Sequence, residues 1–407
     1  MDFSIFLPTI EIGPPYVGPM AGLRRYAYSL VQSLVNQNIN IHIATTSVLP
    51  ENDELLNREN VHFYNLPPQI SARGAYSTQT HFYAKNHRRF SKQAFDIFQS
   101  LRSDINFSLI HATEGAAYAF SKAKKKNRLN IPIVVSIHGA VTTGNFKSRL
   151  FVKRPYSRLL RKIIESSDLI LTNSFSLLEK IRRLPKGTKE KTEIVPHSLN
   201  CKKFAQIPKL EDIEKFRDKY DLNLGKVVFL LQGPYITRKS QHEIIECFPE
   251  IIEYHPDSIF LIIGEGPLLS RIKEKIVNLG IEDAVRITGY ITDEELHLAY
   301  HTSDILLYPA TEVSFSTPLI EALASGLPVI AVDAPPMNEM LPPDVDWLYP
   351  PDKKDILIEK IIDIIEDKEA SQQIAFESRK HALEKYDYNI VGKRIKKIYQ
   401  KIIKASE

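Results

Sequence analysis

Short apolar runs alternate with longer stretches of helical periodicity along the whole chain. Several runs are apolar at consecutive positions, as strands buried on both faces of a sheet must be. The runs expected to form strands are Phe3–Leu7, Ile39–Ala44, Leu109–His111, Ile133–Ile137, Leu169–Thr172 and Glu193–Val195 in the first half, and Val227–Leu231, Ile259–Ile263, Ala284–Thr288, Ile305–Tyr308, Val329–Ala331 and Trp347–Tyr349 in the second. Stretches with helical periodicity separate the expected strands of the first half. They lie at about 22–37, 85–103, 115–126, 149–167 and 174–184.

This alternation predicts parallel sheets with helices on both faces. Because it occurs twice, we expect an α/β protein of two Rossmann-like, doubly wound domains that face a cleft. The expected bounds are 1–205 and 206–385, followed by a helical tail at 386–407 that packs back on the first domain. Ligands of such sheets bind beyond the carboxyl ends of the strands, so the loops that follow strands are the place to look for chemistry.

The composition is that of an ordinary globular protein. Of 407 residues, 43% are hydrophobic and 25% charged, so each domain can bury a core. Two cysteines are too few for a disulfide framework, and no apolar run reaches the ~18–20 residues of a membrane span. We therefore expect a cytoplasmic protein, in which the apolar run Phe3–Ile10 is a buried strand rather than a signal peptide.

The charge is divided unevenly along the chain. Residues 1–205 hold 29 Lys and Arg against 14 Asp and Glu, a charge of +15, whereas 206–407 hold 24 against 35, a charge of −11. The first half is therefore expected to meet an anionic partner. Within 147–162 there are seven cations and no acid, together with aromatic residues and leucines. We predict contact of this segment with an anionic membrane surface; the alternative is a solvated helix face.

A loop of small residues leads into a helical pattern in the second half. Thr317 is a suitable N-cap, Pro318 a suitable first helical residue and Gly326 a suitable left-handed cap. Backbone N–H groups from Ser316 onward would then form an anion site suited to a diphosphate. Glu321 lies one turn further on, where it could accept hydrogen bonds from sugar hydroxyls or simply complement the helix dipole.

Two other loops follow strand patterns in the second half. In one, Gly233 precedes Arg238 and Lys239, which stand where the loop turns into a helix. These adjacent cations could hold a diphosphate or form a solvated surface pair. In the other, Gly264-Glu265-Gly266 follows a strand, but Leu269 stands where a dinucleotide fingerprint needs its third glycine, which favours a tight turn.

The first half offers two candidates of its own. Gly22, near the start of the first helix, allows close approach of a phosphate or acceptor, or belongs to an ordinary loop. His138, followed by Gly139, stands at the carboxyl end of a strand and is either a substrate contact or structural. No pair of His or Cys residues has metal spacing, and neither a nucleophile elbow nor a Walker lysine loop is present.

Taken in order, these segments resemble the retaining GT-B glycosyltransferases of family 4, over nearly the whole chain. The resemblance is carried by Ala21–Tyr26, Ser136–Gly139, Asp168–Ser174, Val195–Asn200, Ile263–Pro267 and Pro318–Ile330. It implies that the second domain holds a nucleotide-sugar donor, UDP- or GDP-linked, and the first a glycan or lipid-linked acceptor of cell-surface polysaccharide or glycoconjugate synthesis. No metal, cofactor or nucleic acid is implied.

The resemblance also implies roles for single residues. His138 would lie beside the donor sugar, Lys239 would neutralise the diphosphate and Glu321 would bind the ribose. The implied donor-binding residues are Gly22, Gly233, Arg238, Gly264, Glu312, Ser316, Thr317 and Pro318.

The sequence departs from the family pattern in the donor loops. The family usually has two glutamates eight positions apart, but Val313 stands eight before Glu321, with Glu312 one place off. Pro234 replaces an arginine, for which Arg238 is the candidate substitute, and serines replace glycines at 314 and 316. The alternative is therefore a non-catalytic or weakened GT-B subunit that binds a glycan or a partner enzyme. A GT-B epimerase fits less well because it needs no large basic half.

Overall fold

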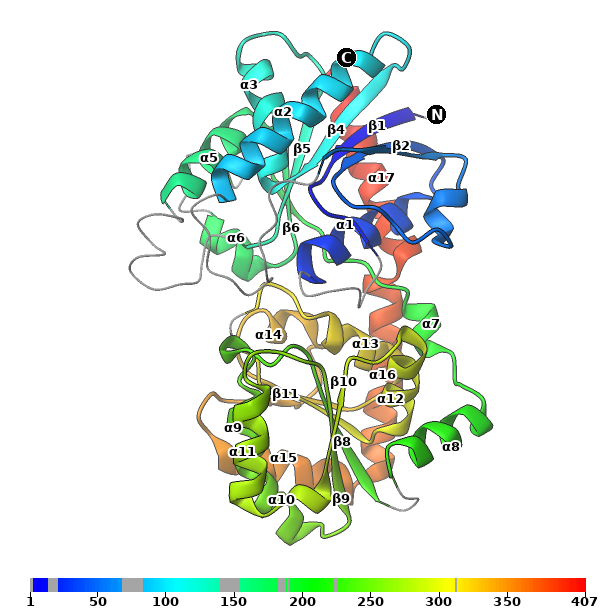
Figure 1. Ribbon diagram of the computed structural model, residues 1–407, viewed down its shortest axis with the longest axis vertical. Helices are drawn as coiled ribbons and strands as arrows, with labels where there is room; N and C mark the ends of the chain where they lie inside the picture. Colours follow the sequence, from blue (N-terminus) through cyan, green and yellow to red (C-terminus); the bar gives the residue numbers. More distant parts are fainter. Residues whose placement is uncertain are drawn as a thin grey trace. The chain divides into compact units, whose positions relative to one another are not determined.

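The structure, a computed structural model, describes residues 3–13, 21–67, 83–139, 154–181, 188, 190–222, 226–311 and 313–407. The chain divides into two compact units: unit 1 comprises Met1–Ser198 and Tyr388–Glu407, and unit 2 comprises Leu199–Asp387. Each consists of helices packed around a parallel sheet (Figure 1), which confirms the predicted α/β class with two doubly wound domains.

Unit 1 is built on seven parallel strands in the order β3-β2-β1-β4-β5-β6-β7. Their bounds are β1 Phe3–Pro8, β2 Ile39–Thr45, β3 Val61–Asn65, β4 Phe107–Thr113, β5 Ile133–Ile137, β6 Leu169–Thr172 and β7 Thr192–Ile194. The apolar-run analysis missed β3. This strand lies at the sheet edge and buries only Val61 among its five residues, so it needs no continuous apolar run.

Helices cover both faces of this sheet. One face carries α2 (Tyr83–Leu101), α3 (Tyr118–Lys125), α5 (Arg154–Ser166) and α6 (Phe175–Ile181), and the other carries α1 (Ala21–Leu34) and the C-terminal α17 (Tyr388–Lys404). Short 3-10 turns, η1 (Glu54–Asn57) and η3 (Glu114–Ala117), complete the unit. Helix α17 packs very closely on α1: a Cβ at Gly392 would lie 1.9 Å from the carbonyl oxygen of Ser33. Only glycine permits this approach.

The observed boundaries of unit 2 lie at Ser198/Leu199 and Asp387/Tyr388, instead of 205/206 and 385/386. Asn200 caps α7 (Cys201–Ala205) by accepting from the N–H of Lys203, and this helix packs on α13 and α16 of unit 2. Cys201 and Phe204 are both buried there. The segment 199–205 therefore belongs to the core of unit 2.

Unit 2 is built on six parallel strands in the order β10-β9-β8-β11-β12-β13. They are β8 Val227–Gln232, β9 Ser258–Ile263, β10 Val285–Gly289, β11 Ile305–Tyr308, β12 Val329–Val332 and β13 Leu348–Tyr349, with ends that differ from the expected ones by at most one residue. The longer helices are α8 Leu210–Lys219, α11 Leu269–Leu279, α12 Asp293–Thr302, α13 Thr317–Ser325, α15 Lys354–Glu366 and α16 Lys368–Tyr386. The short ones are η5 Thr237–Lys239, α9 Gln241–Ile244, η6 Ile245–Cys247, α10 Phe248–Tyr254, η7 Glu282–Ala284 and α14 Met337–Met340.

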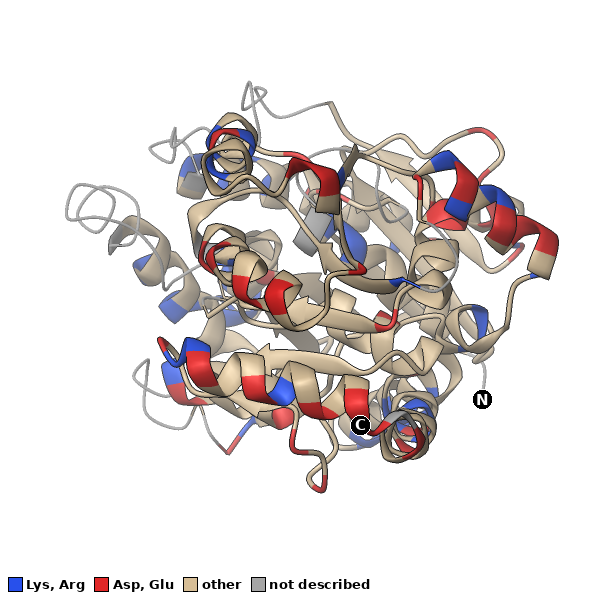
Figure 2. Cartoon of the chain, turned by 90° about the horizontal axis from the view of Figure 1, so that it is seen from below, with Lys and Arg blue, Asp and Glu red and all other residues tan. Residues whose placement is uncertain are grey.

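The charge asymmetry of the sequence is a property of the exposed helices. Acidic residues occur along the helices of unit 2 (Figure 2), and α8 exposes Glu211, Asp212, Glu214 and Asp218. In unit 1, α3 contacts both α2 and α5. The exposed cations of this group, here called the basic helices, are Lys85, Arg88, Arg89 and Lys92 near α2, Lys122, Lys125, Lys126 and Arg128 near α3, and Arg158, Arg161 and Lys162 on α5.

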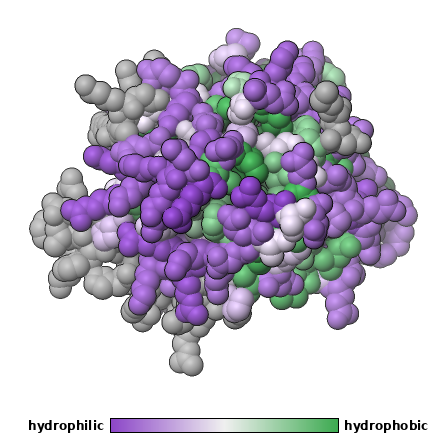
Figure 3. All heavy atoms as spheres, turned by 90° about the horizontal axis from the view of Figure 1, so that it is seen from above, coloured by the Kyte–Doolittle hydropathy of each residue, from purple (hydrophilic) through white to green (hydrophobic). Residues whose placement is uncertain are grey.

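In the described part of the basic segment 147–162, the aromatic residue and the leucines do not add apolar surface for a membrane contact, as a membrane-binding segment would need. Tyr156, Leu159 and Leu160 point into the core and are at most 2% exposed. Residues 147–153 lie outside the described part of the chain. Hydrophilic residues predominate on the face seen in Figure 3, around a smaller hydrophobic area. No helix among the described residues is long and apolar enough to cross a membrane.

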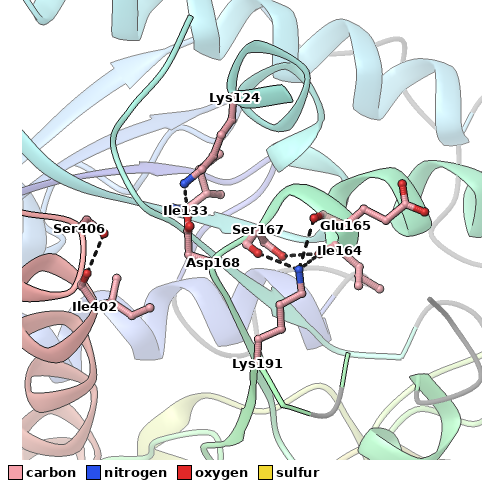
Figure 4. A network of polar contacts seen from close by, with 9 residues as sticks. All are labelled: Lys124, Ile133, Ile164, Glu165, Ser167, Asp168, Lys191, Ile402 and Ser406. Carbon is pink, nitrogen blue, oxygen red and sulfur yellow. Dashed lines mark hydrogen bonds and ion pairs between the residues drawn. The ribbon is translucent and has the colours of Figure 1, made fainter. Parts of the chain in front are cut away.

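A polar network fixes the amino-terminal ends of three strands in unit 1 (Figure 4). Asp168, just before β6, pairs with Lys124 and accepts the backbone N–H of Ile133 at 2.7 Å. Lys191, just before β7, donates to the carbonyls at the end of α5, including that of Ser167 at 2.9 Å. A lysine at these last carbonyls caps the helix and offsets its dipole. The network links the start of β6 to the starts of β5 and β7.

Candidate donor and sugar-binding sites

The start of α13 lies directly after the small-residue loop that follows β11. Ser316 is the N-cap: its side chain accepts the N–H of Leu319 at 3.3 Å. The prediction of Thr317 as N-cap is wrong by one residue, because Thr317 is already helical and Pro318 occupies the second helical position. The helix ends at Ser325 as expected, with Gly326 in the left-handed conformation at φ 73°. The loop thus presents a helix start that can bind an anion.

Glu321 lies inside α13 and is fully buried. One carboxylate oxygen accepts the Tyr300 hydroxyl at 2.8 Å, and that hydroxyl also lies 3.3 Å from the carbonyl of Pro318. A solvated residue that only complements the helix dipole would be exposed, so the geometry disfavours that interpretation. The carboxylate is held in place by Tyr300, which the sequence analysis did not single out.

Lys239 ends the turn η5 that follows β8. Its Nζ donates to the hydroxyl of Tyr308 at 2.5 Å and lies 4.9 Å from the centre of that ring. Tyr308 is the last residue of β11, the neighbour of β8 in the sheet. Lys239 is therefore partly buried and positioned beside the loop that leads to α13, and is not part of a freely solvated pair. Arg238 lies in the same turn, and its side chain is outside the described part of the structure.

The glycines of these loops are required by close backbone contacts. Gly233 and Gly264 have φ of 140° and 135°, where other residues are strained. A Cβ on Gly264 would also lie 2.2 Å from the carbonyl oxygen of Gly233, and one on Gly266 would lie 2.5 Å from that of Tyr235. The two loops are thus locked together, as expected of tight turns at the ends of β8 and β9.

In unit 1, His138 directly follows β5, and its ring lies against that of Tyr26, with centroids 3.7 Å apart. His138 Nδ1 lies 3.0 Å from Nε2 of His197, which is also 3.1 Å from Nδ2 of Asn173. Nε2 of His138 is buried without a hydrogen-bond partner among the described residues. Burial, then the neighbouring His197 and His111, hold the pKa of His138 well below its usual value. His138 is therefore a neutral ring with one unused nitrogen.

Glu114 joins this site from the start of η3, directly after β4, the strand beside β5. Its carboxylate accepts the backbone N–H of His138 at 3.0 Å and the hydroxyl of Tyr156 at 2.5 Å. Glu114 is 1% exposed and has φ of 44°, which is unusual for a residue with a side chain. Glu114 was not among the predicted site residues. Its signal was a carboxylate just after a central strand, which is the position that drew attention to His138.

A further polar chain lies beneath this group. His111 on β4 bonds through Nε2 to Ser136 Oγ at 2.6 Å, and through Nδ1 to the hydroxyl of Tyr399 on α17. Tyr26 completes it with a hydroxyl 2.7 Å from the same Ser136 oxygen. Burial lowers the pKa of His111 to about 3, so this ring is neutral as well. The C-terminal helix thus helps to support the strand ends that carry His138.

Several predicted site residues have an incomplete description. Gly22 lies in the first turn of α1, and Glu312 lies outside the described residues. Among the described residues, no group of three or more His, Cys, Asp or Glu is arranged to hold a metal ion.

Unit 2 also contains a cavity of about 350 Å³, away from the predicted site. It lies at the amino-terminal ends of β8, β11 and β12, where it is lined by residues such as Val227, Asp304 and Pro328. None of the predicted donor-binding residues lines it. The cavity is therefore at the edge of the sheet opposite to Lys239 and the start of α13, and it reaches the end of α13 at Ser325.

Comparison with known proteins gives two family matches. The model described as Glycosyltransferase Family 4 matches residues 20–203, and that described as Glycosyl transferases group 1 matches 212–381. The chain is 24% identical over 266 residues to alpha-monoglucosyldiacylglycerol synthase of Streptococcus pneumoniae, a match that covers 64% of this chain and 59% of that protein. It is 22% identical to an uncharacterized glycosyltransferase of Methanocaldococcus jannaschii over 98% of both chains.

Among solved structures, Anabaena HepE in complex with UDP superposes with a TM-score of 0.73 at 16% identity, over 98% of this chain and 100% of that chain. HepE has also been crystallised with UDP-glucose. At this identity the likeness concerns the fold, which is that of two Rossmann-like domains.

Proposed function

The chain belongs to glycosyltransferase family 4, and from this premise we propose that it transfers a sugar from a nucleotide-sugar donor to a glycan or lipid-linked acceptor, with retention of the anomeric configuration. The observation that carries the proposal is the position of Lys239. Its ammonium group is held against Tyr308, at the end of the strand from which the loop to α13 departs. A fixed cation beside a helix start is an arrangement suited to a diphosphate.

In this proposal unit 2 binds the donor. Lys239 and Arg238 contact the diphosphate, while the main chain at Gly233 leaves room for it and Gly264 packs its own turn against that of Gly233. Backbone N–H groups of Ser316 and Thr317, with Pro318 setting the helix start, bind phosphate and sugar. Glu321, held by Tyr300, accepts hydrogen bonds from the ribose hydroxyls. Glu312 is the further donor contact proposed for unit 2, and Gly22 is the one proposed for unit 1. The UDP bound by the structural neighbour HepE makes UDP the first base to test.

The proposed chemistry needs positioning and charge stabilisation more than a protein nucleophile. The bond from the anomeric carbon to the diphosphate oxygen breaks, and the acceptor oxygen bonds to that carbon on the same face. The acceptor proton passes to the departing phosphate oxygen. Lys239 stabilises the negative charge that develops on this leaving group, a role for which a bound metal is not required. His138 hydrogen-bonds a hydroxyl of the transferred sugar.

For the acceptor, we propose that the basic helices of unit 1 hold the protein on an anionic membrane surface, as a peripheral protein at the cytoplasmic face. Eleven exposed cations lie on or beside α2, α3 and α5, and Asp96 and Glu165 are the exposed acids within these helices. Since the described apolar side chains of α5 point inward, the attraction is electrostatic. The pneumococcal relative is named for a glycolipid product, which makes lipid acceptors the first class to test.

The proposal is tested by incubating the protein with a panel of UDP- and GDP-sugars and with lipid and glycan acceptors, and by determining the anomeric configuration of any product by NMR. Transfer with retention is expected for one donor. An inverted product would contradict the proposed chemistry. No turnover of any donor would favour a non-catalytic subunit.

A further inference from the structure

The unused nitrogen of His138 lies at the end of a hydrogen-bond chain that begins at a backbone amide. The N–H of Leu177, in the first turn of α6, donates to Ser174 Oγ at 3.2 Å. The Ser174 hydroxyl lies 3.2 Å from Oδ1 of Asn173, to which it donates. Because an amide N–H can only donate, the direction of the first bond is fixed, and the Ser174 hydroxyl is placed to donate its own proton to Asn173 Oδ1.

This first step orients the side-chain amide of Asn173. With Oδ1 facing Ser174, Nδ2 faces Nε2 of His197 at 3.1 Å. The Nδ2 group carries only protons, so His197 Nε2 must supply a lone pair. Burial, then the charge of Arg25, lower the pKa of His197 to about 3, so this ring is neutral and its proton lies on Nδ1.

The lone pair on His197 Nε2 also determines which ring nitrogen of His138 carries the proton. His138 Nδ1 lies 3.0 Å from His197 Nε2, which carries no proton, so the proton of this bond belongs to His138. Since His138 is neutral, its other nitrogen, Nε2, is then bare. Asn173 and His138 thus both direct a donor at the lone pair of His197 Nε2.

We propose that Asn173 and His197 are positioning residues that hold His138 as the Nδ1–H tautomer, so that its Nε2 accepts a hydrogen bond from a substrate hydroxyl. The tautomer follows from contacts within unit 1. The identity of the hydroxyl, on the transferred sugar, rests on the proposed function.

The direct test is the tautomeric state of His138 in protein labelled with ¹⁵N-histidine, read at neutral pH from long-range ¹H–¹⁵N correlations and assigned with His138→Gln. We expect a protonated Nδ1 and a bare, pyridine-type Nε2. The reverse pattern would overturn the proposal, because it would mean that the Asn173 amide faces the other way. This measurement needs no substrate, and a variant is used only to assign the signals.

Asn173→Asp makes the test sharper, because a carboxylate can only accept. His197 Nε2 must then carry a proton, which it shares with the carboxylate and with His138 Nδ1. We expect the proton of His138 to move to Nε2, whereas the signal of His42, which lies on β2 and bonds Tyr64, stays unchanged as an internal reference. If the tautomer of His138 stays unchanged in a folded Asn173→Asp variant, the proposed hydrogen-bond chain is contradicted. Ser174→Ala, which removes only the lock on the amide, is expected to give a mixture of the two tautomers.

A kinetic measurement separates this proposal from the proposed function. If His138 Nε2 accepts a hydroxyl of the transferred sugar, Asn173→Asp should lower kcat/KM about tenfold, the scale of one hydrogen bond. If the His138 tautomer changes in Asn173→Asp but kcat/KM does not, the hydrogen-bond chain is supported, and His138 is excluded from the sugar site.

Discussion

Lys239 Nζ donates to the hydroxyl of Tyr308, 69 positions further along the chain, at 2.5 Å. Parallel pairing of β8 with β11 brings the two residues to one edge of the sheet of unit 2. A cation that is already fixed in place loses little entropy when it meets a developing negative charge, which is the condition for effective charge stabilisation.

We expect Lys239→Ala to lower turnover on the order of 100-fold or more, because it removes a cation from the leaving group. Arg238→Ala should be milder. The matched control is Tyr308→Phe, which keeps the ring and removes only the hydroxyl bond, so a loss of about tenfold or less is expected. If Arg238→Ala is the more damaging change in steady-state kinetics, the assignment of the diphosphate contact to Lys239 is wrong.

Glu321→Gln should weaken donor binding about tenfold to a hundredfold, which is the range expected for loss of a charged hydrogen bond of about 1.5–3 kcal/mol. Glutamine keeps the shape of the side chain and a partner for Tyr300, so the fold should survive. Glu312→Ala, one position out of the family register, should have a smaller effect. Donor affinity measured by calorimetry and left unchanged by Glu321→Gln would exclude this carboxylate from the site.

The membrane proposal is tested by co-sedimentation with liposomes. Neutralising Arg158, Arg161 and Lys162 to glutamine should weaken binding to anionic liposomes about 100-fold at low salt, since each cation contributes about 1 kcal/mol, and high salt should weaken binding by the wild type. The control neutralises three exposed cations of unit 2: Arg271, Lys273 and Lys353. The proposal that the basic helices bind the membrane would be contradicted if both variants lose liposome binding equally. It would also be contradicted if the wild type binds anionic liposomes no more strongly than neutral ones.

Unit 1 should lose stability in mild acid. Burial lowers the pKa of His87, His111 and His197 to about 3 in the folded state. Between about pH 6.5 and pH 3 these groups bind more protons when unfolded, so the free energy of unfolding falls as the pH falls. Each contributes up to about 1.4 kcal/mol per pH unit. Denaturant titrations at pH 6 and pH 5 should show this loss, and His87→Gln should reduce it; equal stability at both pH values would contradict these pKa shifts.

Much of the fold could be predicted from the sequence, because strands buried on both faces, such as Ile133–Ile137, need unbroken apolar runs. The edge strand Val61–Asn65 could not, since one buried side chain leaves too weak a pattern. The left-handed cap at Gly326 was also predictable from local chemistry.

The supporting contacts of the site were less accessible. Glu114 meets His138 only because β4 and β5 are neighbours in the sheet, and Tyr300 meets Glu321 through the packing of two helices. Pairings of this kind depend on strand order and side-chain direction. A single sequence shows the residues but not which of them the fold brings together.

The central claim is that the loops at the carboxyl ends of β8 and β11 bind a nucleoside diphosphate. The most direct measurement is calorimetric titration of the wild-type protein, Lys239→Ala and Glu321→Gln with UDP and with GDP. We predict saturable binding of one nucleotide to a single site of the wild type, weakened in both variants, whose melting curves without nucleotide stay unchanged. Folded wild-type protein that binds neither nucleotide, or that binds one with an affinity unaltered by both substitutions, would contradict the account.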